Sequence, residues 1–149
     1  KTVTTHEDAA YTFGASDFGF GDAKDSPANT LQAVKITTVP GAGTLKLSGV
    51  AVTVGQVISA ANIGNLVFAP AVDGNGTGYA NFTFQVQDSG GTANSGVDLD
   101  QRPKTITVNV TAVNDAPTGT DKTVTTHEDA AYTFGASDSV GGASWEDRV

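Results

Sequence analysis

Acidic side chains are the most abundant chemically active groups of this sequence, and they gather where extended segments end. The chain has 16 Asp and Glu residues against 8 Lys and Arg, which gives a net charge of −8 at pH 7. Aspartate oxygens beside turns are ligands that hard cations prefer, but Asp is also a frequent turn former that simply faces water. For any single Asp, both interpretations stay open.

The acids fall into two groups if consecutive strands run in alternate directions between the two ends of one domain. The first group takes in residues 6–8, 73–75 and 114–115. Carboxylates this concentrated repel one another unless a cation neutralises them. Ca²⁺ accepts six to eight oxygens in flexible geometry, whereas Mg²⁺ requires a stricter octahedron. The second group, at the opposite end, consists of Asp17, Asp22, Asp25, Asp88, Asp98 and Asp100. We expect this group as a set to bind calcium.

The sequence lacks the residue combinations that catalysis requires. DGNGTG at residues 73–78 begins like an EF-hand loop, but its twelfth position is Phe84 where a bidentate Glu is needed. His6 and Glu7 lack the second histidine of a zinc-protease helix, and no serine has the context of a nucleophile elbow. The absence of cysteine removes thiol catalysis, thiolate zinc sites and disulfides. We expect a protein that is not an enzyme, with a hydrolase as the weakest alternative.

Strands must position the acids, because no segment keeps a period of 3.6 residues and many alternate with a period of two. YANFTFQVQD at residues 79–88 is the clearest case, and Gly, Pro and Asp turns separate the segments. The count of about seven strands predicts an all-β fold, a seven-stranded antiparallel Greek-key sandwich. The strands are expected at 1–5, 9–16, 31–39, 44–49, 66–70, 79–88 and 104–113, with a further short extended piece at 50–58 and one helical turn at 59–65.

The negative charge argues against binding to nucleic acid or to an anionic membrane surface. No apolar run approaches the roughly 20 residues that span a bilayer. The first residues, KTVTTHED, lack the apolar centre of a signal peptide, and we expect the chain to be part of a larger protein. Secreted small domains usually contain disulfides, so an extracellular location would call for another kind of cross-link.

An internal repeat organises the chain. KTVTTHEDAAYTFGASD occupies residues 1–17 and recurs without change at residues 122–138, an offset of 121 residues. This period is too long for a solenoid unit and matches a whole domain. We predict a complete repeat at residues 1–113, a linker at 114–121, the start of a second, truncated repeat at 122–138, and a non-matching tail at 139–149.

Four stretches together carry a family likeness: FGFGDAKDSPANTLQAVKITTVPGAGTL, LVFAPAVDGNG, FTFQVQDSGGTANSGVDLD and TITVNVTAVNDAPT. In this order they resemble the bacterial cadherin-like repeats of the VNDAP type, which stand in tandem in giant secreted RTX-type adhesins. The resemblance covers residues 1–138. It implies a cadherin- or immunoglobulin-like sandwich that acts as a calcium-stiffened extender at the bacterial cell surface, serving adhesion and biofilm formation.

The resemblance also implies where calcium binds, namely at the junction between consecutive repeats. The matching ligands are Asn114 and Asp115 in the linker, Glu7 near the end of the first strand, and Asp138 on the rim of the next repeat. The corresponding rim of the first repeat holds Asp17, Asp22, Asp25 and Asp88, with Asp98 and Asp100 in the same loop as Asp88. After Asp138 the second copy departs from the first, and the counterparts of Asp22 and Asp25 are missing.

Two questions stay open. The partners are expected to be adjacent repeats of the same polypeptide, but residues 122–138 can either be disordered or fill, in another chain, the slot that residues 1–17 occupy. Insertion within one chain is strained, because eight extended linker residues reach only about 26–29 Å. The alternative function is a calcium-dependent carbohydrate- or protein-binding module, for which Phe18 and Phe20 are the candidate stacking residues, although we expect both rings to fill the top of the sandwich.

Overall fold

The computed structural model describes residues 1–139 and divides the chain between Val113 and Asn114 into two units, Lys1–Val113 and Asn114–Val149. Residues 140–149, which make up nearly all of the predicted non-matching tail, lie outside the described residues. None of the helices in the described part is long and apolar enough to cross a membrane.

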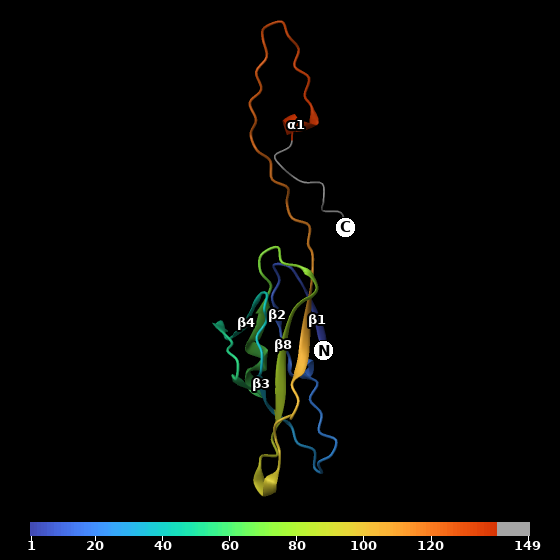
Figure 1. Cartoon of the computed structure of the whole chain (residues 1–149), viewed down its shortest axis with the longest axis vertical. Helices are drawn as coiled ribbons and strands as arrows, with labels where there is room; N and C mark the ends of the chain where they lie inside the picture. Colours follow the sequence, from blue (N-terminus) through green and yellow to red (C-terminus); the bar gives the residue numbers. More distant parts are fainter. Residues whose placement is uncertain (140–149) are drawn as a thin grey trace. The chain divides into compact units, whose positions relative to one another are not determined.

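The first unit consists of two β-sheets (Figure 1). The five-stranded sheet has the order β1 (Thr2–His6), β9 (Lys104–Thr111), β8 (Gly76–Asp88), β3 (Leu31–Ile36) and β6 (Val57–Ser59). The four-stranded sheet has the order β2 (Tyr11–Thr12), β7 (Leu66–Ala69), β4 (Thr44–Leu47) and β5 (Val50–Ala51). The architecture is mostly β and consistent with an all-β sandwich.

The pairing differs from the predicted antiparallel arrangement at one place. β1 runs parallel to β9, with Thr2 opposite Thr107 and His6 opposite Thr111, so the five-stranded sheet is mixed. Sequence alternation indicates that a segment is a strand but carries no information on the direction of its partner. Here the partner is the last strand of the unit, about a hundred residues away.

The strand count also differs, with nine strands in the described residues instead of seven. The stretch 50–58 splits into β5 and β6, which join different sheets. The stretch 9–16 keeps only β2, because the chain turns into the 3₁₀ helix η1 (Ala15–Phe18), which Gly19 ends with a φ of 58°. The expected helical turn at 59–65 is present as the 3₁₀ helix η2 (Ala60–Asn65), and a third, η3, spans Ala93–Ser95.

The core lies where both sheets contribute apolar side chains. β8 alternates as its sequence predicts, and Ala80, Phe82 and Phe84 are buried. Phe13 packs edge-on against Phe82 with ring centroids 5.5 Å apart. Phe18, at the end of η1, packs in the same way against Phe84 at 4.9 Å. The core therefore fixes both ends of residues 13–18, which carry one of the predicted metal ligands, Asp17.

The second unit contains no strand among its described residues, 114–139. Its one helix there is α1 (Ala136–Ser139). The side chains of Tyr132 and Phe134 form an edge-to-face pair with centroids 5.1 Å apart, and both are exposed. The two strands that alternation predicts for this copy are absent, because strands need neighbours to pair with.

Candidate metal centre

Acidic residues gather at the two ends of the first unit. The linker pole is the end at which β1 finishes and β8 begins, with Glu7, Asp8, Asp73 and Asn75. The loop pole is the opposite end, lowest in Figure 1, where the loops after η1 and β8 meet. It holds Asp22, Asp25, Asp88, Asp98 and Asp100. The sorting of the acids by strand direction therefore agrees with the observed arrangement, except that Asp17 lies deeper, in η1.

Glu7 is the anchor of the linker pole. Its side chain is buried, with 4% of its surface exposed. One carboxylate oxygen accepts a hydrogen bond from the backbone N–H of Val113, and the other accepts one from Nδ2 of Asn75 at 2.8 Å. These two hydrogen bonds lower the pKa of Glu7 below its ordinary value of 4.5, against the opposing effect of burial. Glu7 thus ties the end of β1 to the β7–β8 turn and to the residue with which the first unit ends.

Three exposed carboxylates approach one another here. Ligand oxygens of Asp8, Asp73 and Asp115 all lie within 4.8 Å of one another, the only such group of three in the described part of the chain. Asp115 follows Val113 by two residues, so the chain itself tethers it close to the Glu7 hydrogen bond. Asp8 and Asp73 both have positive φ, 60° and 56°, a backbone conformation that Asp tolerates better than most residues.

The ligand set fits a hard cation. Three carboxylates at this spacing repel one another in water, and oxygen-only donors are those that Ca²⁺ uses. The sequence predicts Asp115 as a calcium ligand. It places Asp8 and Asp73 at this end of the unit but does not mark them as ligands. The usable signal was their place in the same turns as Glu7 and Asn75. The close approach of the Asp8 and Asp73 carboxylates depends on turn conformations, which the alternation of side chains does not predict.

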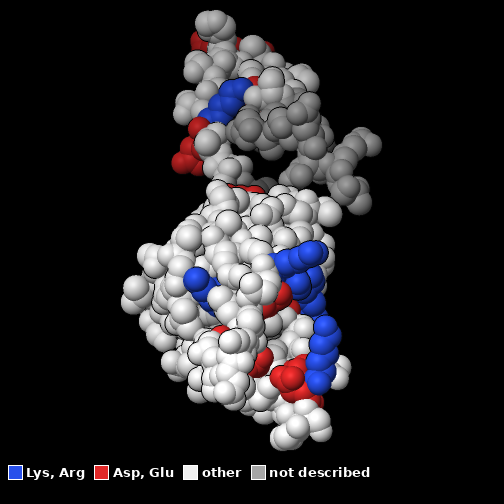
Figure 2. All heavy atoms as spheres, turned by 60° about the horizontal axis from the view of Figure 1, so that its bottom comes forward, with Lys and Arg blue, Asp and Glu red and all other residues white. Residues whose placement is uncertain are grey.

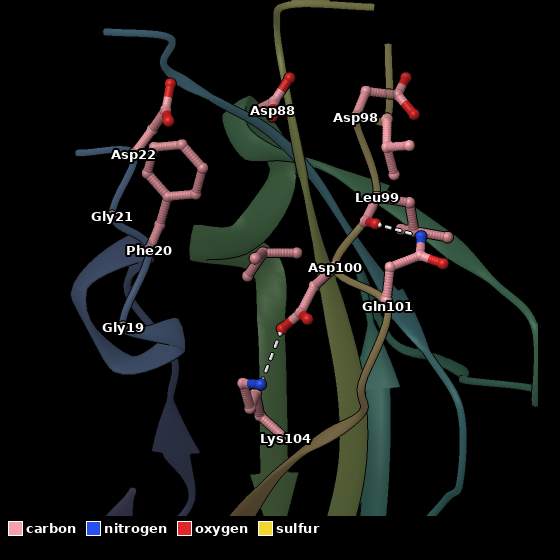
Figure 3. A pocket seen from close by; sticks show the side chains of 12 residues that line it. Gly19, Phe20, Gly21, Asp22, Asp88, Asp98, Leu99, Asp100, Gln101 and Lys104 are labelled. Carbon is pink, nitrogen blue, oxygen red and sulfur yellow. Dashed lines mark hydrogen bonds and ion pairs between the residues drawn. The ribbon is translucent and has the colours of Figure 1, made fainter. Parts of the chain in front are cut away.

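The loop pole has a different character. A pocket of about 450 Å³ opens there, lined by Phe20 and by four of the predicted ligands, Asp22, Asp88, Asp98 and Asp100. Asp22, Asp88 and Asp98 point to the same side in Figure 3, while Asp100 turns toward Lys104. Figure 2 shows that basic side chains accompany acidic ones on this face. The Lys104–Asp100 ion pair at 3.2 Å is one of these contacts.

Each loop-pole acid already has a partner inside the unit. The donors are backbone N–H groups or amides for Asp22 (Asn29 N, 2.7 Å), Asp25 (Asn29 Nδ2, 2.9 Å), Asp88 (Gly90 N, 2.7 Å) and Asp98 (Gln87 Nε2, 2.9 Å). The backbone N–H of Asn29 lowers the pKa of Asp22. Burial opposes ionisation of Asp100, but hydrogen bonds from Arg102 and Lys104 outweigh it and lower its pKa. The predicted calcium ligation at this pole stays a prediction.

Asp17 and Asp138 occupy equivalent places in the two copies of the repeated sequence. Asp17 is buried and accepts hydrogen bonds from the N–H of Gly14 at 2.9 Å and the hydroxyl of Tyr11 at 3.2 Å. Burial raises the pKa of Tyr11, and the Asp17 charge adds to this effect. The hydrogen bonds from Gly14 and Tyr11 indicate that the Asp17 carboxylate stabilises the turn in which it lies.

Asp138 makes the matching contacts. Lys122 Nζ and the N–H of Gly135 each lie 2.8 Å from its carboxylate, and together they lower its pKa to about 2. Asn114, the last of the predicted ligands, donates from Nδ2 to the carbonyl oxygen of Asp115 at 3.2 Å.

A comparison with family models, curated proteins and solved structures finds no match for this chain.

Proposed function

We propose that this chain is a calcium-binding extender repeat of a secreted bacterial adhesin. The Asp8–Asp73–Asp115 group carries the proposal, because it gathers carboxylates from the turn after β1, the β7–β8 turn and the residues that follow β9. The role is structural: repeats of this kind stiffen a tandem array that projects adhesive domains toward a surface. The chain is not an enzyme under this proposal.

Calcium would do at the linker pole what disulfides do in other small secreted domains. It would neutralise the repulsion among the three carboxylates and cross-link turns that Glu7 already brings together. Ligand binding to the folded state alone stabilises it by about 2.7 kcal/mol when free ligand is a hundredfold above its dissociation constant. Because Asp115 is a linker residue, calcium would also restrict the start of the linker.

The finer assignments belong to the same proposal. The resemblance of residues 1–138 to VNDAP-type repeats supports a cadherin-like Greek-key topology, adjacent repeats as partners, and an extracellular location. It also supports a rim of further ligands, which are Asp17, Asp22, Asp25, Asp88, Asp98, Asp100 and Asp138, with Glu7 and Asn114 at the junction. The three carboxylates whose oxygens lie within 4.8 Å of one another make the linker pole the first place to look for calcium.

Titration calorimetry with calcium chloride tests the site with a matched pair of variants. Asp129 stands in the second copy where Asp8 stands in the first, with the same φ of 60°. Asp8→Asn and Asp73→Asn are expected to weaken calcium binding at least tenfold, the effect of about 1.4 kcal/mol. Asp129→Asn is expected to leave it unchanged. Equal affinities in Asp8→Asn, Asp73→Asn and the unmodified chain would remove the linker pole from the proposal.

The loop-pole pocket favours one alternative, a calcium-dependent module that binds a carbohydrate or a protein. Phe18 cannot stack on a ligand because it is buried, but Phe20 is half-buried and lines the pocket beside carboxylates. Aromatic faces next to polar groups are common in sugar sites. In a glycan array with calcium, this alternative predicts binding that Phe20→Ala abolishes, whereas the extender function predicts no bound glycan.

A further inference from the structure

The second copy of the repeated sequence keeps the local conformation of the first. The N–H of Ala9 donates to the carbonyl of His6 at 3.2 Å, and Ala130 donates to His127 at 3.2 Å. The hydroxyl of Thr5 donates to the carbonyl of Ala9 at 3.0 Å. The corresponding bond, from Thr126 to the carbonyl of Ala130, measures 2.9 Å. Both copies thus form the same turn.

Three further contacts of the segment recur in the second copy. The ring centroids of Tyr11 and Phe13 are 5.0 Å apart, against 5.1 Å in the second copy. The carboxylates of Asp17 and Asp138 accept the N–H three residues earlier at 2.9 and 2.8 Å. Each is also close to the lysine that opens its copy, at 3.8 and 2.8 Å. A segment already in its bound conformation loses less conformational freedom when it binds.

The two copies differ in what covers them. Phe13 is 1% exposed inside the core, whereas Phe134 is 74% exposed. Glu7 is buried at the linker pole, whereas Glu128 is exposed. The second copy therefore exposes apolar side chains whose counterparts in residues 1–17 are buried in the first unit. Its local conformation already resembles that of residues 1–17. Exposed aromatic side chains of this size gain most from burial.

The place occupied by residues 1–17 can be refilled, because both of its strands are at sheet edges. β1 is the edge of the five-stranded sheet beside β9, and β2 is the edge of the four-stranded sheet beside β7. An edge strand has one neighbour, so replacing it breaks no other strand pair. The unit that receives a new edge segment keeps all its remaining strand pairs.

We propose that residues 122–138 of one chain occupy, in a second copy of this chain, the place that residues 1–17 hold in the first unit. The identical sequences make the contacts equal, so local concentration decides between them. The attached first copy has the advantage of an effective concentration in the millimolar range. Exchange therefore dominates where the first copy is weakened or the chains are crowded, and this interaction requires no metal.

A second chain is the occupant rather than the same chain. In the first unit the carbonyl of Lys1 accepts a hydrogen bond from the N–H of Thr107 on β9. Thr107 lies six residues before Val113, the residue with which the first unit ends. Residue 122 would have to return along that strand by about 20 Å and also cross to its edge. The eight residues of the linker 114–121 reach about 26–29 Å only when fully extended, so nearly the whole linker would have to be straight to make the return and the turn around the strand end. Exchange between chains has no such limit.

Matched substitutions in the full chain test the exchange. Val3 is buried in the core, and Val124 is its counterpart. Val3→Asp is expected to be a folded oligomer whose size grows with concentration, because Val124 replaces Val3. Val124→Asp is expected to be a folded monomer. The double variant is expected to melt about 10 °C or more below Val3→Asp, because neither copy fits. Light scattering and circular dichroism measure both properties.

Equal melting of Val3→Asp and the double variant would overturn the proposal, and so would a Val3→Asp chain that is folded and monomeric. Engineered cysteines give a second readout, since the chain contains none of its own. Thr2 pairs with Thr107 in the sheet, at a spacing that allows a disulfide. A mixture of Thr107→Cys chains with Thr123→Cys chains, each also carrying Val3→Asp, is expected to form mixed disulfide dimers. Dimers no more abundant than in either chain alone would also overturn it.

Discussion

At the scale of single residues, Glu7 has the clearest role. It is a buried carboxylate whose two oxygens are used by two parts of the chain far apart in sequence, Asn75 and Val113. A carboxylate that accepts hydrogen bonds is stabilised in its ionised form, which is why the fold lowers its pKa. We therefore expect the linker pole to be sensitive to acid.

Replacement of Glu7 by Gln is expected to lower the melting temperature at neutral pH. Because the folded pKa lies below the ordinary 4.5, the contribution of the carboxylate is fully present above pH 4.5 and is lost as pH falls through the folded value. The difference between the unmodified chain and Glu7→Gln should therefore shrink below pH 4.5. Glu128→Gln, at the exposed equivalent position, is the control and should match the unmodified chain at every pH. A constant difference across the acid range would contradict the assignment.

The two copies also provide a test of core packing with the same residue type. Phe13→Ala removes a ring that is fully buried among aromatic neighbours, and is expected to cost about 3–5 kcal/mol of unfolding free energy. Phe134→Ala removes an exposed ring, and is expected to change stability by about 0.5 kcal/mol or less. Urea unfolding measures both. Similar losses in the two variants would show that Phe134 is buried in solution.

At the scale of elements, alternation located the strands but not their partners. β8 was readable because Phe82 and Phe84 alternate with Thr83 and Gln85 over a long run. The shortening of 9–16 to β2 depended on Gly19 ending a 3₁₀ helix, which local propensity does not distinguish from a strand that continues. The parallel β1–β9 pair is a long-range contact, and a period of two is the same for either direction.

Two glycines at strand ends both have a positive φ, but only one of them has close neighbours. Substituting each by Ala therefore distinguishes the effect of backbone strain from that of steric contact. Gly43 has a φ of +68°, and an added Cβ would lie 2.6 Å from Cζ of Phe68 and 2.7 Å from the carbonyl oxygen of Ala69. Gly49 has a φ of +83° with nothing within 4 Å of that position. Gly43→Ala is expected to lose about 1–3 kcal/mol more than Gly49→Ala, because only the former overpacks the core. Thermal unfolding compares them, and equal losses would mean that Phe68 can move aside.

At the scale of the whole molecule, strand direction was enough to predict two acidic ends. It was not enough to predict which oxygens meet, since Asp8 and Asp73 come together through turns with positive φ. The loop-pole acids were the stronger expectation from the sequence, yet in the described part of the chain the three carboxylates that approach within 4.8 Å of one another lie at the linker pole. Loop conformation, which the alternation of side chains does not encode, therefore decides which end is the better candidate for calcium.

The central claim is that calcium stabilises this fold specifically. The most direct measurement is the thermal melting of the full chain in saturating calcium, in the same concentration of magnesium, and in excess chelator. With calcium a hundredfold above its dissociation constant, a midpoint about 10 °C above that in chelator is expected, and magnesium should reproduce little of the shift. A midpoint that is the same in calcium and in chelator would contradict the claim and leave the acids as solvated turn residues.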